Sequence, residues 1–324
     1  MTNTKKGFKV PRIPGDLIIY PMVIGVILNS FIPQFLNMGG FLTAIKGGTA
    51  ALVGIFLFFL GASLDIKSTP QAVKRGGIVI ITKVLASVGL GLLVAFVFKD
   101  NFLGLSSLAI IGGVSVANNA LYSGITAEYG TDAEKGAVGI TILSVGPIVT
   151  MIALSSAGLA SISIWSIIGC ILPLALGVIL GAAFPYLKEI LSVCYPGCII
   201  VVGFALGANM SFAQLFQGGV QGILLGIISS VIIGAITIIV DKATGGSGVA
   251  GAAISSNAAS GVANPAALAA VDPAYAAIAP IATSQIAASV ILTAFLAPLI
   301  TGWVHKRNLK KQANTNAMGR KVAA

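Results

Sequence analysis

Long apolar segments alternate with short polar or charged turns along almost the whole of this 324-residue chain. Each segment is close to the roughly 20 residues that a helix needs to cross the hydrocarbon core of a bilayer. The segments lie at about 17–36, 47–64, 77–98, 105–127, 136–159, 162–184, 193–212, 219–240, 248–270 and 275–304. The pattern therefore predicts an all-α polytopic membrane protein with about ten transmembrane helices.

The fourth and ninth segments are apolar, but they would be poor lipid-facing helices. Residues 112–127 read GGVSVANNALYSGITA and residues 248–270 read GVAGAAISSNAASGVANPAALAA, so both carry amides and hydroxyls at their centres. Pro265 also removes a backbone donor. Because unpaired polar groups are costly in lipid, such segments are tolerated only within protein or around a watery cavity. Interrupted spans at corresponding positions of two halves are typical of the binding site of a secondary transporter.

The two halves of the chain resemble each other. LGAS at 60–63 closes the second segment and LGAN at 206–209 closes the seventh, and a polar loop and a glycine pair follow each. Five spans is an odd number, so the second half would insert upside down relative to the first. We therefore expect two inverted five-helix repeats, residues 1–160 and 161–305, with crossed, interrupted fourth and ninth helices. Residues 306–324 would form a basic cytoplasmic tail, polar and mobile.

The composition excludes a soluble protein, since 56% of the residues are hydrophobic and only 9% are charged, against about 25% charged in soluble domains. The net charge of +10 does not indicate nucleic-acid binding, because the basic residues lie between spans and at the ends. With both termini in the cytoplasm, only Lys46 and Lys99 of these basic residues fall outside, as the positive-inside rule requires. Glu128, Asp132 and Glu134 indicate a charged loop rather than a carboxylate pair.

The candidate substrate site combines polar side chains of the interrupted segments with those of the last segment. Unwound backbone and these side chains would bind a hydrophilic solute, and the N-termini of half-helices would suit a carboxylate. Close helix packing explains the small residues of these segments, but not their asparagines or their proline. The predicted substrate-binding residues are Ser115, Asn118, Asn119, Tyr122, Ser255, Ser256, Asn257, Ser260, Asn264, Thr283 and Gln285.

Lys83 is the only charged residue well inside a predicted span, where its burial costs about 2.5–3.5 kcal/mol. It could snorkel to the basic loop, pair with an anionic substrate, titrate, or replace a sodium ion as a tethered charge. The other candidates for ion coupling or charge balance are Ser63, Thr141, Ser144 and Asn209. For Ser63 and Asn209, helix capping is an equally good explanation.

Several motifs together resemble the 2-keto-3-deoxygluconate permease family: FFLGASLDI, ITKVLAS around Lys83, NNALYSGITAEYGTDAEKGA, VGPIVTMI and IAPIATSQIAASVILTAFLAPLITGW. The resemblance extends in matching order from about residue 11 to residue 303. It implies a bacterial inner-membrane symporter for a small anionic sugar acid, usually proton-driven, with a bile acid:sodium symporter-like (BART superfamily) fold. It also implies carboxylates at the positions of Ser115 and Ser144, so their absence here leaves the coupling ion open between H⁺ and Na⁺.

These observations predict uptake of 2-keto-3-deoxygluconate or a similar sugar acid by alternating access, with one helix bundle rocking against the other. The alternatives are a sodium-coupled organic-anion symporter and a cation/proton exchanger of the same fold. Such an exchanger normally needs a buried carboxylate at the crossing, and neither interrupted segment carries one. No enzymatic motif, metal site or cofactor is predicted. The expected partners are the sugar acid and the lipid bilayer, and a homodimer is left open.

Overall fold

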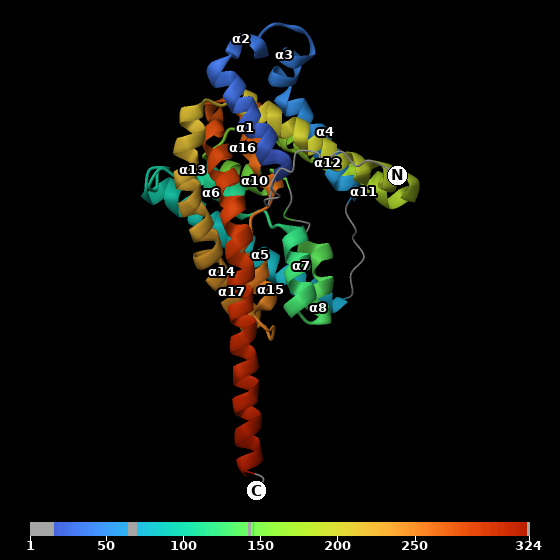
Figure 1. The fold of residues 1–324 in the computed structure, drawn as a ribbon, viewed down its shortest axis with the longest axis vertical. Coiled ribbons are helices and arrows are strands. Elements are labelled where there is room, and N and C mark those ends of the chain that lie inside the picture. The colour runs from blue at the N-terminus through green and yellow to red at the C-terminus, as the bar shows by residue number, and fades with distance from the viewer. Residues whose placement is uncertain (1–15, 64–69, 142–143, 145, 323–324) are drawn as a thin grey trace, which may run out of the picture.

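The computed structural model describes residues 16–63, 70–141, 144 and 146–322. Within these residues the chain is helical, and its only β-structure is two isolated bridges. Residues 1–15, which carry the basic residues of the N-terminal end, and Lys67 lie outside the described residues. The helices form two packed groups that contact each other in the body of the molecule (Figure 1).

The first group, called here the four-helix group, contains helices from both halves of the sequence. Its members are α1 (Asp16–Phe31), α4 (Thr49–Ser63), α11 (Ile164–Ala183) and α12 (Pro185–Ala208). Helix α12 packs against both α1 and α4, and α11 packs against α4. Glycines allow this close approach: a Cβ added at Gly207 would collide with the backbone carbonyl of Met22, and one at Gly61 would collide with that of Leu174. The LGAS and LGAN motifs therefore serve helix packing within this group.

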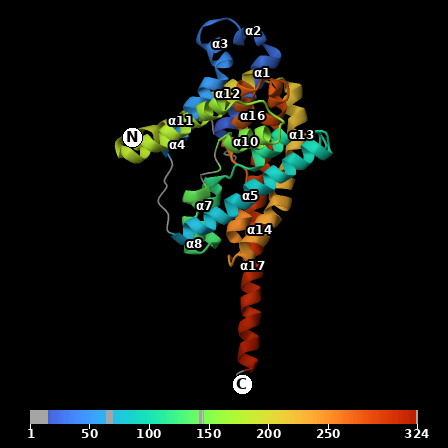
Figure 2. The same ribbon diagram turned by 180° about the vertical axis from the view of Figure 1, so that it is seen from behind.

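The second group, called here the crossing group, holds both interrupted segments. Its long members are α5 (Pro70–Val97), α13 (Phe212–Ile227) with η2 (Ile228–Ile233) and α14 (Gly234–Ala243), and α17 (Ala279–Val322). The interrupted members are α6 (Ser107–Val114) with α7 (Asn119–Tyr129), and α15 (Val249–Ala253) with η3 (Ala259–Ala263) and α16 (Asn264–Val271). The short members are α8 (Asp132–Gly136), α9 (Val138–Thr141), α10 (Ile148–Ser156) and η4 (Pro273–Tyr275). Figure 2 shows α5 running obliquely across this group.

The two ends of the molecule differ. The short helices α2 (Pro33–Leu36) and α3 (Gly40–Gly47) form one end, and α17 projects far beyond the body at the other end (Figures 1 and 2). Helix α3 meets α4 at a bend of 74°, at the glycine pair Gly47 and Gly48. Helix α17 continues beyond Val304 to Val322, into the predicted basic tail.

The described helices include five that are long and apolar enough to cross a membrane, or six if the bent pair α3–α4 counts as one span. These five are α5, α11, α12, the continuous run Phe212–Ala243, and Ala279–Lys310 within α17. Large apolar side chains such as Trp165, Val193 and Phe216 are 73–77% exposed, as expected of lipid-facing helices. The protein is therefore an all-α, multi-pass membrane protein.

Some predicted boundaries were wrong. The predicted seventh span began at 193, whereas α12 begins at Pro185 and includes the charged Lys188. Proline fits the first position of a helix, because its missing N–H would have no intrahelical partner there. The predicted fifth span is broken, since Gly146 adopts a φ of 92° just before Pro147.

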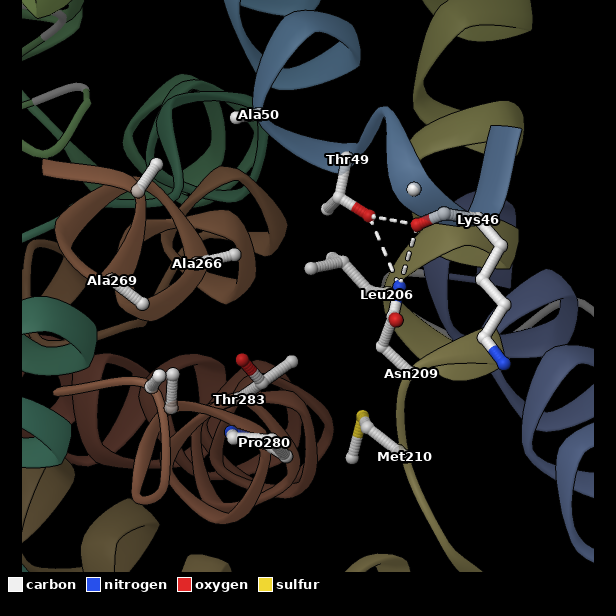
Figure 3. Close-up of a pocket in the computed structure, with 14 residues that line it drawn as sticks. Lys46, Thr49, Ala50, Leu206, Asn209, Met210, Ala266, Ala269, Pro280 and Thr283 are labelled. Carbon is white, nitrogen blue, oxygen red and sulfur yellow. Dashed lines mark hydrogen bonds between the residues drawn. The ribbon is translucent and has the colours of Figure 1, made fainter. Parts of the chain in front are cut away.

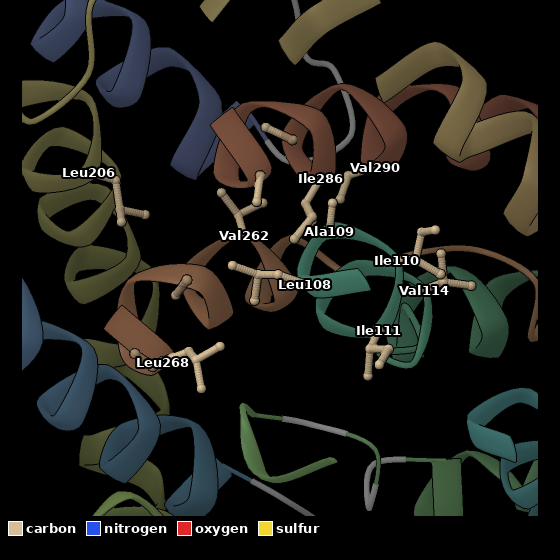
Figure 4. Close-up of a cluster of buried hydrophobic side chains, with 14 of the residues drawn as sticks. Leu108, Ala109, Ile110, Ile111, Val114, Leu206, Val262, Leu268, Ile286 and Val290 are labelled. Carbon is tan, nitrogen blue, oxygen red and sulfur yellow. The ribbon is translucent and has the colours of Figure 1, made fainter. Parts of the chain in front are cut away.

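A buried apolar cluster holds the interrupted helices in place. Every residue of α6 is buried, and Leu108 and Ile111 belong to the same cluster as Val262 and Leu268 of the other interrupted segment. Ile286 and Val290 of α17 and Leu206 of α12 complete the view in Figure 4. The two breaks and the helices α6 and α15 that lead into them are thus buried in protein, as irregular backbone at membrane depth requires.

Candidate functional site

The two helix breaks meet in space, although about 140 residues separate them in the sequence. Ala117 and Asn257 form an isolated antiparallel β-bridge. The Asn118 N–H donates to the carbonyl of Ser256 at 3.3 Å, and the Ala258 N–H donates to that of Val116 at 3.2 Å. Each break therefore satisfies the backbone groups that the other leaves free, as a buried irregular segment must. We call these paired residues, 116–118 and 256–258, the crossing.

The hydrogen bonds of the crossing follow a local two-fold pattern. The N–H of Ala117 donates to Ser144 Oγ at 3.1 Å, and the N–H of Asn257 donates to Thr293 Oγ1 at 3.0 Å. Ser144 follows an Ile-Leu pair and so does Thr293, in corresponding parts of the two halves. The same role is therefore filled twice by a hydroxyl residue. Ser144 was a predicted residue, and Thr293 was missed, although Ile-Leu-Thr at 291–293 matches Ile-Leu-Ser at 142–144 and could have revealed it.

Lys83 reaches the crossing from the middle of α5, with a side chain that is completely buried. Its Nζ donates to the carbonyl of Ser256 at 2.6 Å and to that of Val116 at 3.3 Å. These carbonyls are the two that the local two-fold pattern relates. Among the described residues Lys83 has no carboxylate partner. The alternative that Lys83 snorkels to the basic loop is therefore wrong, since its ammonium group points into the protein.

Asn257 is the most connected polar side chain of the crossing. Its Oδ1 accepts from Ser229 Oγ at 2.7 Å, and its Nδ2 donates to Ser289 Oγ at 3.1 Å. Ser229 also lies 2.8 Å from the carbonyl of Ser255. Ser229 lies in η2, a π-helical turn within the long Phe212–Ala243 helix. Such a turn often marks a functional site. Ser229 and Ser289 complete the site. Neither was among the predicted residues.

Most of the other predicted residues of the interrupted segments make bonds within their own segment or with a neighbour. The hydroxyls of Ser115, Ser255 and Ser256 donate to carbonyls three or four residues earlier. Asn118 caps α7 through its side chain. Asn119 Oδ1 accepts from Thr141 Oγ1 at 2.9 Å, and Asn264 Nδ2 donates to the Gly112 carbonyl at 2.7 Å. Ser260 lies in η3 and is buried.

Other predicted residues lie away from the crossing. The Tyr122 hydroxyl donates to the backbone carbonyl of Glu134. Gln285 Nε2 donates to the carbonyl of Gly104 at 2.8 Å, and Ser63 bonds to the Leu60 carbonyl of its own helix. The structure therefore gives each of these three side chains a structural partner outside the crossing.

A cavity of about 460 Å³ lies between the two helix groups, at the α2–α3 end. Thr49, Leu206 and Asn209 line it from the four-helix side. Ala266 of α16 and Thr283 of α17 line it from the crossing group, on the opposite side of the cavity from Asn209 (Figure 3). Asn209 and Thr283 were predicted residues. The cavity is otherwise lined mainly by alanine, glycine and other small or apolar residues, which no sequence motif marks.

A charged cluster at the opposite end was also missed. Glu134 is only 1% exposed, and its Oε1 accepts from the Ser247 hydroxyl at 2.6 Å. Asp241 is completely buried, accepts from the N–H of Gly248 at 2.9 Å, and lies 3.5 Å from Arg75. The prediction of a plain charged loop was therefore wrong for Glu134. Its capping box with Thr131, a T-x-x-E motif, was a readable signal.

The described residues contain no group of three or more His, Cys, Asp or Glu side chains that could hold a metal ion. The polar atoms of the crossing are instead hydroxyls, amides, backbone carbonyls and one lysine. This set can hold a hydrophilic solute or a small cation, but it offers no general acid–base pair.

Comparison with known proteins identifies the family. The model of the family described as "2-keto-3-deoxygluconate permease" matches residues 8–310. The 2-keto-3-deoxygluconate permease 1 of Salmonella typhimurium is 42% identical over 311 residues, which cover 95% of this chain and 98% of the relative. The 2-keto-3-deoxygluconate permeases of Enterobacter sp. (strain 638) and Tolumonas auensis are 36% and 34% identical over 306 residues, covering 92% of this chain and 92% and 91% of the relatives. The chain therefore belongs to the 2-keto-3-deoxygluconate permease family, whose members are transporters and not enzymes.

Proposed function

We propose that this protein is a secondary active transporter that takes up 2-keto-3-deoxygluconate or a similar sugar acid by ion-coupled alternating access. The observation that carries the proposal is the cavity of about 460 Å³ between the two helix groups. Its volume lies within the ~300–1,000 Å³ typical of small-molecule sites. The names of the relatives supply the substrate class.

The packing supports a rocking motion of one group against the other. The four-helix group is held together by glycine-mediated contacts at Gly61 and Gly207, and the crossing group by its shared hydrogen bonds. The cavity wall combines residues from both groups. A rigid-body rotation would therefore close this cavity without breaking either group, as in other two-bundle carriers.

The ten-span, inverted-repeat topology belongs to the same proposal. The paired hydrogen bonds of the crossing support it, because Ser144 and Thr293 play the same role in the two halves. In the orientation favoured by the positive-inside rule, both termini are cytoplasmic and the α2–α3 end faces outward. Asn209 and Thr283, which line the cavity at that end, would then contact substrate that enters from outside the cell.

The hydrogen bonds of Lys83 support a role for this residue in coupling. A charged ammonium group has three N–H donors, and the described residues offer Lys83 two acceptors, the carbonyls of Val116 and Ser256. A neutral amine has two N–H donors, and these two carbonyls accept both of them. We propose that Lys83 gains a proton when the anionic substrate binds and releases it on the other side. The alternative is that the charged ammonium group replaces a sodium ion at the crossing, so that coupling uses another ion.

The direct test is uptake of labelled 2-keto-3-deoxygluconate by proteoliposomes that contain the purified protein. The pH gradient and the sodium gradient would be imposed separately. We expect uptake driven by acid outside, with no sodium requirement. Uptake driven by sodium alone would reject proton coupling and favour a cation site among the hydroxyls and amides of the crossing. Folded protein that takes up neither this compound nor other sugar acids would refute the proposed function.

A further inference from the structure

The cavity between the two helix groups contains one charged lining residue, Lys46. It lies in the last turn of α3, directly before the bend that leads into α4. None of the ion pairs between described residues includes Lys46. A cation without an anionic partner among the described residues thus lies in the wall of a cavity assigned to an anionic substrate.

The ammonium group of Lys46 is held away from the cavity. Its Nζ donates to Asn37 Oδ1 at 3.1 Å and to Asn29 Oδ1 at 3.3 Å. In Figure 3 the side chain points away from Thr283 and Pro280, which line the far wall. Both acceptors are neutral amide oxygens at fairly long distances. Hydrogen bonds from an ammonium group to a carboxylate are shorter and stronger than those to neutral acceptors, so a substrate carboxylate competes well with Asn29 and Asn37.

Hydrogen bonds hold the backbone of Lys46 at the cavity wall, whereas its side chain can rotate to different partners. Its carbonyl accepts from Asn209 Nδ2 at 2.9 Å, and Thr49 Oγ1 donates to the same carbonyl at 3.1 Å. The side chain is a flexible four-carbon stem that ends in three rotatable donors. Rotation of this stem would move the charge from the two asparagines toward the cavity without any change in the backbone.

The remaining polar groups of the cavity suit the rest of a sugar acid. Thr49, Asn209 and Thr283 offer two hydroxyls and an amide, which match sugar hydroxyl groups. None of these three carries a charge, so none can by itself distinguish a sugar acid from a neutral sugar.

From this geometry we propose that Lys46 is the residue that selects anionic substrates, exchanging Asn29 and Asn37 for the substrate carboxylate when the sugar acid enters. The proposal rests on the proposed transport of sugar acids and adds the residue that recognises the acid. Lys46 acts here as a binding residue for specificity, whereas Lys83 serves coupling.

The test compares uptake kinetics of labelled 2-keto-3-deoxygluconate in four variants. We expect Lys46→Gln to raise KM about tenfold or more with a smaller change in kcat, because a tenfold change corresponds to one lost interaction of about 1.4 kcal/mol. The KM of Lys46→Arg, which keeps the charge, should stay within about threefold of the wild type. Asn37→Asp keeps the lysine but gives it a permanent carboxylate partner, so it should also raise KM. Lys99→Gln is the matched control, an exposed lysine of the same predicted face that does not line the cavity.

Competition gives a second readout that a merely structural role would not produce. Unlabelled gluconate should inhibit wild-type uptake much more strongly than glucose, and this preference should shrink in Lys46→Gln. An unchanged KM and an unchanged preference in folded Lys46→Gln would overturn the proposal while leaving the proposed function intact.

Failure of the wild type itself would be distinguishable. If wild-type liposomes transport another sugar acid instead, the same variants are measured with that anion. If folded wild-type protein transports no sugar acid, the proposed function fails and the role of Lys46 is rejected with it.

Discussion

The sharpest prediction concerns Lys83→Met, which should abolish transport while leaving the fold almost unchanged. Methionine is unbranched and apolar like the stem of lysine, so it fills the space within α5. The carbonyls of Val116 and Ser256 would not be left unpaired, since each also accepts a backbone N–H across the crossing. The substitution removes a titrating group and very little packing.

The magnitudes support this separation. Two hydrogen bonds from the neutral amine of the empty carrier contribute about 0.5–1.5 kcal/mol each, and the substitution also removes the cost of burying a polar amine. The free energy of unfolding should therefore fall by at most about 3 kcal/mol. Lys83→Ala, by contrast, also removes the buried stem and should cost about 2–5 kcal/mol, as large-to-small core substitutions do.

The assay is uptake of labelled substrate under an imposed pH gradient, with thermal unfolding of the purified protein in detergent as the measure of folding. We expect Lys83→Met to lose at least 100-fold in initial rate, or about 2.7 kcal/mol at 1.36 kcal/mol per factor of ten. Ser87→Ala, one helical turn away, is the matched control because, among the described residues, the Ser87 hydroxyl donates to the Lys83 carbonyl and to no other group. Wild-type uptake by folded Lys83→Met would refute the role of this lysine in coupling.

Three further predictions concern stability, measured by thermal unfolding in detergent. Gly207→Ala should cost about 1–3 kcal/mol or more, because its Cβ would strike the backbone of α1 in a tightly packed interface. Gly197→Ala on the same helix should change little, since nothing lies within 4 Å of its Cβ. Thr150→Val should stabilise the protein by about 1 kcal/mol, because the Thr150 hydroxyl is buried without a partner among the described residues and that is costly. Asp241→Asn should lower the free energy of unfolding by about 3–5 kcal/mol, because Arg75 loses its carboxylate partner. The double variant with Arg75→Gln should recover part of this loss. A Tm equal to that of the wild type in Asp241→Asn would contradict the reasoning.

The sequence was informative wherever lipid makes a residue type costly. Polar residues in the middle of apolar segments predicted the breaks around Ser115 and Ser255, and the structure brings both breaks together. The high cost of a charge in lipid also predicted that Lys83 lies at the site and does not reach the membrane surface. Lys83 is completely buried, as this prediction requires. In each case a polar or charged residue within an apolar segment indicated a buried site, because such a group is costly in hydrocarbon.

The sequence was uninformative about features that arise from packing. Alanine and glycine in the cavity wall, as at Ala266, look the same as alanine and glycine in a helix interface. Lys46 was read only as an exception to the charge bias of the loops, because its place beside the cavity depends on how α3 meets α4. Glu134 looked like part of a solvated loop, because its partner Ser247 comes from the other half of the chain.

The hydrogen bonds of the crossing also limit how a solute can bind there. Asn257 already has partners at both ends of its amide, and the hydroxyls of Ser115 and Ser256 are occupied by carbonyls of their own helices. A polar site in a membrane must be satisfied when it is empty, because an unpaired buried group costs free energy. In the proposed transport cycle, an ion or solute at the crossing would therefore replace protein partners and would not fill a vacant site. Binding would then change hydrogen bonds that join α5, α17 and both interrupted segments. Occupancy of the crossing and movement of the helix groups would therefore be linked by the same hydrogen bonds.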